Sequence, residues 1–381
     1  KFSIPKELIE TLDIKNHERI LFEVVKESKR QGNIDKKSID LTKIEGYNII
    51  YREGNLITLF KKARTIITLP RFIKISPELV ELFFLIHGDG HYQYKLYFVN
   101  KNYELIDFVM EEFEKILKIS RDYWRARVLF NNSSNPEEAK AFWKNKLKLK
   151  EEQFYPTISK SILNTSEIGN LRIVLETPII SDLFKYIFEE IQKNDDYLFY
   201  ALNGLLCAEG GARKNKRGLH KITISFSQKE KLMFENILRN TKILELCKIS
   251  QNSRFCIEKW DNLYLFFKIF FSNNIIPFNL HSQRCKNALD GFLNHGFTQT
   301  ITKYLYILNK KEEFEVKDLV NEMGYLPNSI LNTLRKKQYS QFIKIGGRGI
   351  KGNPFIISIT SEGKEFITLI KNMREAYNAR Y

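Results

Sequence analysis

Residues 82–90 read LFFLIHGDG, and residues 202–210 read LNGLLCAEG. Each copy is an apolar run followed by a small residue, one acid and a glycine. The two acids, Asp89 and Glu209, lie 120 positions apart, a suitable length for one structural unit repeated once. An apolar run that stops at glycine predicts a buried helix with a C-terminal glycine cap. We therefore expect the chain to be organised around two equivalent helices.

Both acids stand where a carboxylate costs stability. A helix C-terminus carries partial negative charge, so an acid in the last turn is repelled by roughly 0.3–1 kcal/mol. The same end exposes backbone carbonyls, and carboxylate and carbonyl oxygens are the ligands that Mg²⁺ prefers. In the second copy, Gly204 and Ala208 form a small face that permits close helix approach. If the two helices pack side by side, Asp89 and Glu209 would lie at one metal-binding site along their interface. Paired metal ions stabilise the attacking and leaving oxygens when a phosphodiester bond is cleaved.

The two stretches resemble the paired motifs of the LAGLIDADG family of homing endonucleases, in the single-chain form that carries both. The resemblance covers roughly residues 76 to 296. It implies an α+β fold with two pseudo-symmetric αββαββα halves, motif helices at their interface and two antiparallel sheets over DNA. It also implies Mg²⁺-dependent hydrolysis of phosphodiester bonds in double-stranded DNA, at a site that another divalent cation such as Mn²⁺ or Ca²⁺ could occupy in a crystal. By position, Asp89 and Glu209 match the catalytic, metal-binding acids, and Gly88 and Ala208 match the residues that offer carbonyls.

The chain departs from the family pattern at three positions of the motifs. Phe84 takes a place that is usually held by a small residue, and its bulk would loosen or rotate the helix interface. His87 and Cys207 replace a frequent inner Asp, at a position that varies in the family. His87 and His91 flank Asp89, and we expect them to be interface and surface residues rather than bases, because metal ions can supply the hydroxide.

The composition indicates a polyanionic partner. The net charge is +16 over 381 residues, which favours nucleic acid, although excess Lys can also serve solubility alone. The four cysteines form no C-x-x-C pair, which disfavours zinc and fits a reducing, cytoplasmic setting. The sequence contains no apolar run of about 18 residues, so we expect no membrane association. We expect a monomer that binds double-stranded DNA, with RNA as an alternative partner.

Four segments follow from the pattern of turns and apolar periods. Residues 1–75 are expected to form a small β-rich module, 76–192 the first half with an insertion near 131–168, 193–296 the second half, and 297–381 a separate module. In the first segment, residues 49–52 and 56–60 predict a hairpin, and residues 69–71 a linker. Residues 3–24 resemble the first half of AbrB-type swapped-hairpin modules, which bind DNA; a structural cap is the alternative.

Each half is expected to run helix, hairpin, helix, hairpin, helix. In the first half, Ser76 and Pro77 begin the motif helix, helices are expected at 102–119 and 178–191, and strands at 91–100, 124–130 and 171–175; the insertion should hold a helix at 136–147. In the second half, we expect helices at 197–209, 228–240 (capped by Ser227) and 260–272, a basic turn at 213–218, and strands at 220–226, 246–250 and 254–258.

The C-terminal segment resembles a winged helix-turn-helix domain. Helices are predicted at 298–308, 316–323 and 328–337, with a Gly-containing turn at 324–327 between the last two. Strands at 342–345 and 355–359 flank a glycine-rich basic tip, and a final helix follows Thr360. In such a domain the helix at 328–337 would enter the major groove. The alternative is a helical module that binds protein.

The residues expected to contact nucleic acid are basic positions on strands and turns, together with polar and basic positions of the C-terminal module. They are Lys95, Arg125, Arg127, Arg172, Arg213, Lys214, Lys216, Arg217, Lys221, Lys248, Arg254, Asn328, Ser329, Asn332, Arg335, Lys336, Arg348 and Lys351. Most contacts of this kind set affinity and register rather than sequence.

Three functions remain open at this point. The first is a Mg²⁺-dependent homing endonuclease with an additional DNA-reading domain. The second is a transcription regulator on a LAGLIDADG scaffold that does not cleave; loss of the acids would favour it, and both acids are present. The third is an intron maturase, since the two antiparallel sheets that the resemblance implies could bind RNA as well as DNA.

Overall fold

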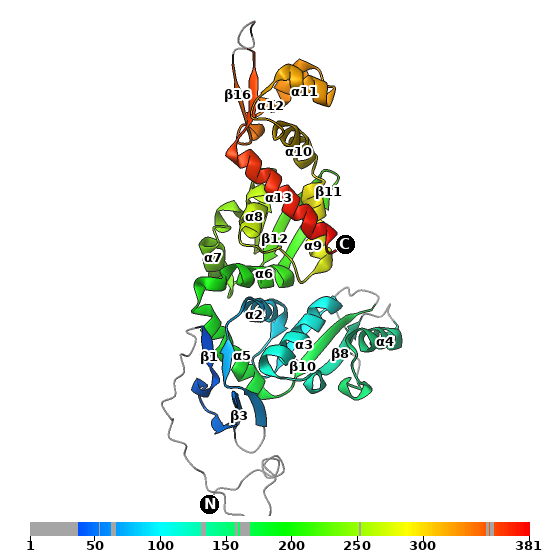
Figure 1. Cartoon of the computed structure of the whole chain (residues 1–381). Helices are drawn as coiled ribbons and strands as arrows, with labels where there is room; N and C mark the ends of the chain where they lie inside the picture. Colours follow the sequence, from blue (N-terminus) through cyan, green and yellow to red (C-terminus); the bar gives the residue numbers. More distant parts are fainter. Residues whose placement is uncertain are drawn as a thin grey trace, which may run out of the picture. The chain divides into compact units, whose positions relative to one another are not determined.

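The computed structural model describes residues 37–52, 54–61, 66–130, 135–156, 159–160, 168–250, 253–347, 350 and 354–381. The chain divides into two compact units, Lys1–Gly204 and Leu205–Tyr381. Both combine helices with small, mostly antiparallel sheets, so the predicted α+β class is confirmed (Figure 1). The AbrB-like stretch at 3–24, Arg348 and Lys351 lie outside the described residues.

The described part of the first unit begins with five strands. They are β1 (Ser38–Asp40), β2 (Asn48–Tyr51), β3 (Leu56–Phe60), β4 (Ile66–Pro70) and β5 (Phe72–Lys74). β1 pairs with β5, and β2, β3 and β4 form an antiparallel sheet, which confirms the predicted hairpin. The predicted linker at 69–71 is wrong. Leu69 is fully buried at the end of β4, and the Arg71 N–H donates to the Asn55 carbonyl.

The first repeat follows. Its elements are α2 (Pro77–Asp89), β6 (Gly90–His91), β7 (Leu96–Asn100), α3 (Tyr103–Leu117), β8 (Arg125–Phe130), α4 (Pro136–Leu147), β9 (Ser159–Lys160), β10 (Asn170–Leu175) and α5 (Pro178–Gln192). The strand expected at 91–100 is instead the hairpin β6–β7. The strands lie in the order β6-β7-β10-β8-β9, with only β9 parallel to its neighbour. The predicted helix at 136–147 is confirmed as α4, between β8 and β10.

The second repeat has the same element order without the insertion. Its elements are α6 (Leu198–Glu209), β11 (Gly210–Asn215), β12 (Gly218–Ser225), α7 (Lys231–Asn240), β13 (Cys247–Ser250), β14 (Arg254–Glu258) and α8 (Trp260–Ser272). The sheet order is β11-β12-β14-β13. In both sheets, therefore, the first strand of the repeat lies beside the second, the second beside the fourth, and the fourth beside the third.

Two details of the second repeat differ from expectation. Helix α7 begins at Lys231, three residues later than predicted, and Ser227 does not cap it; the Ser227 N–H donates to the Glu230 carboxylate in the turn before the helix. The predicted basic turn is also too long, since Arg213 and Lys214 lie in β11 and pair with β12 across a register shift.

The motif helices begin as predicted, but their terminal glycines serve a different purpose. Ser76 caps α2 by accepting a hydrogen bond from the Leu79 N–H. Gly90 has φ −114°, so a left-handed cap is not the reason for glycine. A Cβ at Gly90 would collide with the Ile86 carbonyl oxygen, and one at Gly210 with that of Leu206. Glycine is needed at both positions because the chain turns back tightly against the helix that it leaves.

Close packing joins α2 to the part of α6 that belongs to the first unit. A Cβ on Gly204 would lie 2.5 Å from the Glu81 carbonyl oxygen and 3.1 Å from the Phe84 Cβ. The Phe84 ring packs instead on Phe188 of α5, with centroids 5.0 Å apart. The expectation that Phe84 would loosen this interface is therefore wrong. Next to Gly204, the buried Asn203 amide donates to the buried Glu81 carboxylate at 2.6 Å.

The rest of the second unit contains helices and one small sheet. Its elements are α9 (Ser282–Leu293), α10 (Gly296–Leu308), β15 (Phe314–Glu315), α11 (Val316–Met323), α12 (Pro327–Leu334), β16 (Ile343–Gly346), β17 (Ile356–Ile359) and α13 (Ser361–Asn378). Gly324 has φ +70° in the turn between α11 and α12, and β15, β17 and β16 form an antiparallel sheet. Helix α12 ends at Leu334, earlier than predicted, and α9 was not predicted at all.

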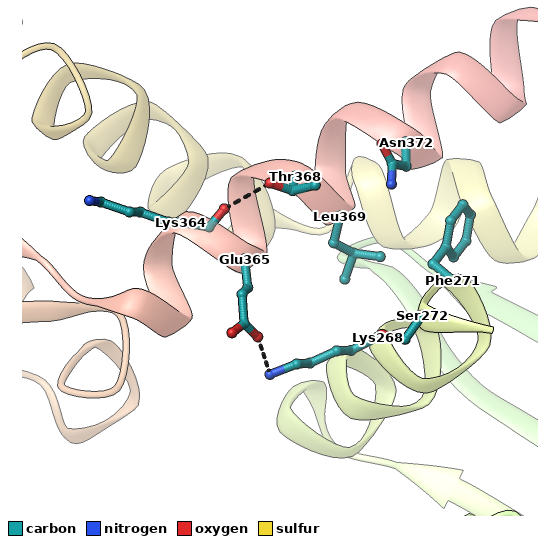
Figure 2. Close-up of a pocket in the computed structure, with 8 residues that line it drawn as sticks. All are labelled: Lys268, Phe271, Ser272, Lys364, Glu365, Thr368, Leu369 and Asn372. Carbon is teal, nitrogen blue, oxygen red and sulfur yellow. Dashed lines mark hydrogen bonds and ion pairs between the residues drawn. The ribbon is translucent and has the colours of Figure 1, made fainter. Parts of the chain in front are cut away.

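Helix α13 packs on α8 through aromatic and charged contacts. Trp260 and Tyr264 of α8 pack against Phe342 and Phe366. Lys268 binds Glu362 at 2.8 Å and Glu365 at 2.7 Å. Figure 2 shows the second of these ion pairs beside a cavity of about 390 Å³ between α8 and α13. None of the predicted site residues lines this cavity.

The remaining short elements are 3₁₀ helices: η1 (Leu41–Lys43), η2 (Arg121–Tyr123), η3 (Glu151–Gln153), η4 (Asp195–Tyr197), η5 (Leu244–Leu246) and η6 (Lys337–Tyr339). Within the described ranges, none of the helices has the length and apolar character that a membrane span requires.

Candidate active site and nucleic-acid interface

Asp89 is the last residue of α2, and the neighbouring strand holds its side chain. The carboxylate is half-buried, and its Oδ2 accepts a hydrogen bond from the Asn100 Nδ2 at 2.8 Å. Asn100 ends β7 and is itself fixed, because its Oδ1 accepts from the Asn102 N–H at 2.8 Å. Asn102 caps α3 by accepting from the Glu104 N–H. The start of α3 and the end of β7 together therefore orient the first carboxylate.

The two histidines near Asp89 make packing contacts. His87 Nδ1 lies 2.7 Å from the Tyr92 hydroxyl, and its ring stacks on Phe188 with centroids 4.7 Å apart. His91 stacks on Tyr97 at 5.0 Å. Both histidines therefore pack on aromatic side chains of the first repeat.

Glu209 is the last residue of α6, and its surroundings differ from those of Asp89. Burial raises the pKa of the Glu209 carboxyl, nearby Glu230 raises it further, and Arg284 acts in the opposite direction. Arg284 also holds the end of the helix itself. Its Nη1 donates to the Cys207 carbonyl at 2.5 Å and to the Ala208 carbonyl at 2.8 Å. A guanidinium is thus bound to the backbone directly before the acid.

The donor atoms at the two helix ends suit a divalent cation unequally. Asp89 offers a half-buried carboxylate that accepts a hydrogen bond from a neutral amide, which fits a hard cation. At the second end, the carbonyl of Ala208, a predicted ligand, already accepts from a cationic group. Among the residues that the structure describes, no group of three or more His, Cys, Asp or Glu side chains is placed to hold a metal ion. Neither helix end alone therefore supplies a full set of protein ligands for a metal ion.

Three predicted arginines share one face of the first sheet. Along β8, Arg125 and Arg127 alternate with buried Ala126 and Val128. The sheet register sets Arg127 directly opposite Arg172 of β10. Like charges directly opposite each other in a sheet are destabilising. The Arg127–Arg172 pair therefore does not stabilise the fold unless an anion binds to the two guanidinium groups.

Two tyrosines hold these arginines in place. The Arg127 guanidinium carbon lies 4.3 Å from the Tyr155 ring centroid, and that of Arg172 lies 4.9 Å from the Tyr97 centroid. Arg125 lies 5.2 Å from Tyr155. None of the three arginines has an ion-pair partner among the described residues, and their buried Nε atoms have no hydrogen-bond partner there. We call these five residues the Arg–Tyr face.

Tyr155 keeps its proton at physiological pH. Burial raises the pKa of its hydroxyl to about 12, helped by the hydrogen bond that the hydroxyl donates to Glu176. The ring therefore remains a neutral platform for Arg125 and Arg127, as a cation–π contact requires.

The corresponding face of the second sheet carries four basic residues and one acid. By register, Arg213 lies opposite Lys221, and Lys221 lies opposite Glu258, with which it forms an ion pair at 3.9 Å. Lys248 and Arg254 occupy the same face on β13 and β14. Lys214 points elsewhere, because its Nζ binds Asp290 of α9 at 2.6 Å.

The other predicted contacts lie on turns and on the C-terminal module. Lys95, Lys216 and Arg217 are exposed in turns. Asn328, Ser329 and Asn332 are exposed on α12, and Arg335 and Lys336 are exposed directly after it. Arg335 stacks over the Phe355 ring at 4.9 Å.

Several residues of these sites were not anticipated from the sequence. Cys285, Ala288, Leu289 and Phe292 follow a helical period, so α9 could have been recognised. The contact of Arg284 with α6 could not, because it joins residues 77 positions apart. Tyr97 and Tyr155 gave no signal, since stacking depends on the three-dimensional register.

Comparison with known protein families and with curated proteins finds no match for this chain.

Proposed function

We propose that this chain is a DNA-binding, divalent-metal-dependent endonuclease of the LAGLIDADG homing type, in the single-chain form. The two repeats are then its αββαββα halves, and α2 and α6 are its motif helices. Support comes from the shared order of the four equivalent strands in the two sheets, the close approach at Gly204, and an acid at the end of each motif helix. The C-terminal elements are then a winged helix-turn-helix domain.

The observation that carries this proposal is the Arg–Tyr face. Three guanidinium groups are fixed side by side by tyrosine stacking, and no acid among the described residues pairs with them. Arginine presents a planar fork of donors that matches phosphate oxygens. Such a preorganised face binds a polyanionic backbone with little loss of side-chain entropy. Because phosphate contacts set affinity and register, this face would position the DNA rather than read its sequence.

The proposed reaction is hydrolysis of a phosphodiester. A water oxygen bonds to phosphorus, the bond from phosphorus to the 3′ oxygen breaks, and the water's proton balances the charge on the leaving oxygen. A bound divalent cation such as Mg²⁺ supplies Lewis-acid stabilisation of this charge. Asp89 and Glu209 would supply the carboxylates that bind divalent cations at the ends of the motif helices, with Asn100 orienting the first. The Arg–Tyr face would hold the flanking phosphates.

The C-terminal module would read additional sequence. Helix α12 exposes Asn328, Ser329 and Asn332 on its first two turns, and amide and hydroxyl groups there can bond base edges in the major groove. Exposed Arg335 and Lys336 would contact phosphates. This arrangement extends the DNA site beyond the region covered by the sheets.

One observation favours a second candidate, a DNA-binding regulator on the same scaffold that does not cleave. Arg284 already occupies the Ala208 carbonyl, which is one of the oxygens that the cleavage reaction would need. Both acids nevertheless remain at the helix ends, so we rank cleavage first.

Selection from a random double-stranded DNA pool, with and without Mg²⁺, tests the proposal. We expect one enriched sequence under both conditions, and cut products only with Mg²⁺. An enriched sequence that is never cut would support the regulator instead. Preferential enrichment from a matched RNA pool would favour a maturase, and no enrichment from either pool would contradict all three functions.

A further inference from the structure

The basic tip of the β11–β12 hairpin is attached to the start of α10. The Gly296 N–H donates to the Arg217 carbonyl at 3.3 Å. Gly218 has φ +113°, and a Cβ there would lie 2.6 Å from the Gly291 carbonyl oxygen and 2.7 Å from the His295 Cα. Only glycine permits both this conformation and this close approach. The exposed side chains of the tip therefore belong to a backbone that α9 and α10 hold in place.

The same end of α10 is bound to the second repeat through Trp260, the first residue of α8. The Trp260 Nε1 donates to the Thr298 Oγ1 at 2.8 Å, and the Trp260 ring meets the Phe297 ring edge-on with centroids 4.3 Å apart. Thr298 is buried. Because separating the two helices would leave buried polar atoms without a partner, these contacts fix α10 on α8.

Helix α12 is attached to α10 about two turns further along. The buried Tyr304 of α10 shares a side-chain hydrogen bond with Thr333 of α12. The Phe297 ring also packs on Tyr339, which is buried in η6 after α12, with centroids 4.7 Å apart. Gly296 and Tyr304 are eight positions apart, so the two attachment points lie about 12 Å apart along the axis of α10. One helix thus connects the basic tip with α12 (Figure 1).

Helix α13 adds a further connection. A Cβ on Gly363, in its first turn, would lie 2.5 Å from the Phe342 carbonyl oxygen and 3.2 Å from the Leu305 Cδ2 of α10. The ion pairs and aromatic contacts of α13 with α8 join the same helix to the second repeat. Domains of one chain move relative to each other unless their interface is large and apolar. Here α10 and α13 both join the C-terminal module to the second repeat within one compact unit, Leu205–Tyr381, so we expect no independent motion of the module.

We propose that α10 holds the basic tip and α12 at one fixed spacing, so that the second repeat and the C-terminal module bind double-stranded DNA as a single rigid body. This inference rests on the proposed function and adds a geometric rule for the target. The DNA segments bound by the tip and by α12 must keep one separation and one helical phase. An insertion of about half a helical turn, roughly 5 base pairs, would move one segment to the opposite face of the duplex. An insertion of about one full turn would restore the phase but lengthen the separation by about 34 Å.

Distance measurement by double electron–electron resonance tests the rigidity in the full chain without DNA. Nitroxide labels are attached at Lys216→Cys in the tip and Asn332→Cys on α12. The half-buried Cys247 is removed as Cys247→Ser, and the other native cysteines are buried. We expect one narrow distance distribution. Gly218→Ala should broaden it about twofold, because a Cβ at this positive φ is strained and would push the tip away from α9. Gly296→Ala, whose Cβ would meet nothing within 4 Å, is the matched control and should leave the distribution unchanged.

A spacer series on the selected DNA tests the consequence for binding. Hydroxyl-radical footprints of Arg217→Gln and Asn332→Ala identify the segments bound by the tip and by α12. Affinity is then measured for DNA with about half a turn or about one full turn inserted between these segments. We expect either insertion to weaken binding by the wild type roughly a hundredfold, because only one segment can be bound at a time. DNA with the same insertion outside the two segments is the control and should bind as the original does.

Two results would overturn the inference. One is a broad distance distribution in the labelled parent protein, and the other is DNA binding that survives the full-turn insertion. Both leave the proposed function standing, since a flexibly attached module can still bind DNA. If Gly218→Ala does not fold, the distribution of the parent and the spacer series decide. A wild type that binds none of these DNA molecules would instead reject the proposed function, and the inference with it.

Discussion

The two repeats share one strand order but differ in the chemistry that they present. The first sheet carries three stacked arginines without an acid partner, whereas on the second sheet Lys221 is paired with Glu258. The first motif helix ends at a carboxylate bonded to an amide, and the second ends beside a guanidinium. The fold depends on the buried alternate positions, which both repeats keep. The exposed positions are free to differ, so duplication need not produce two equal sites.

The motif helices also differ where they touch. Phe83 and Phe84 of the first copy correspond to Asn203 and Gly204 of the second. Gly204 lies against the backbone of α2, so the bulky Phe84 position of the first motif helix faces a position without a side chain on the second. This complementarity explains why the departure at Phe84 does not separate the helices.

The largest effect should come from Gly204→Ala. Its Cβ would lie 2.5 Å from the Glu81 carbonyl oxygen and 3.0 Å from the Leu85 nitrogen, both backbone atoms that cannot move aside. We expect the free energy of unfolding to fall by about 3 kcal/mol, measured by urea denaturation. Gly296→Ala at the start of α10 is the control, because its Cβ would meet nothing within 4 Å. Equal stability of the two variants would refute close packing at Gly204.

A smaller loss should follow from Asn203→Leu. The substitution removes a buried hydrogen bond to Glu81 and leaves that carboxylate less well satisfied, at a cost of about 2 kcal/mol. The double variant with Glu81→Leu should recover most of the loss, because both polar groups are then gone. A double-mutant cycle of unfolding free energies measures this coupling. Additive losses would show that the pair does not couple the two helices.

Glu362→Gln should destabilise the second unit in a pH-dependent way. Burial raises the pKa of the Glu362 carboxyl, but its bonds to Lys268 and Tyr264 lower it more, so that the net pKa is below the ordinary value of 4.5. The stability that this carboxylate contributes is present above the ordinary pKa and is lost as the pH falls through the lowered one. We expect a loss of about 1.5 kcal/mol near neutral pH.

Thermal denaturation between pH 3 and 7 provides the measurement for Glu362. The difference between wild type and Glu362→Gln should shrink on the acid side, since the wild-type carboxyl is then protonated. A stability difference that stays constant over this pH range would show that the charge of Glu362 does not stabilise the packing of α13 on α8.

The smallest expected effect concerns the two sheet faces. Arg127→Ala with Arg172→Ala should weaken DNA binding about tenfold and lower the slope of log affinity against log salt by about 2, for two lost phosphate contacts. Lys221→Ala should change binding less, because Glu258 already neutralises that lysine. Fluorescence anisotropy over a salt series measures both. A larger effect at Lys221 would reverse the ranking of the two faces.

The sequence predicted the elements of the repeats well for a physical reason. Apolar periodicity marks which side of a helix or strand is buried, and it located α3, α4, α8 and most strands to within a few residues. It failed at particular boundaries. Helix α7 begins at Lys231 and not directly after Ser227, although the Glu230 carboxylate accepts a hydrogen bond from the Ser227 N–H. Leu69 and Pro70 end strand β4 instead of forming a linker, because Leu69 is buried and pairs with Ile57 of β3.

The candidate sites were only partly predictable. Asp89, Glu209 and the strand arginines could be named from motif and alternation. The partners that give them their character are distant in sequence: Tyr155 lies beside Arg127, and Arg284 beside Ala208. Such contacts depend on tertiary packing, which no local pattern contains.

The central claim is that the two carboxylates at the motif-helix ends serve cleavage of DNA that the sheets hold. The most direct measurement compares wild type, Asp89→Asn and Glu209→Gln on the selected DNA, with cut strands resolved on a denaturing gel and binding measured in parallel in Ca²⁺. We predict strand cutting by the wild type in Mg²⁺, none by Asp89→Asn or by Glu209→Gln, and nearly equal DNA affinity for all three proteins. Cutting by Asp89→Asn and Glu209→Gln at the wild-type rate would contradict the claim.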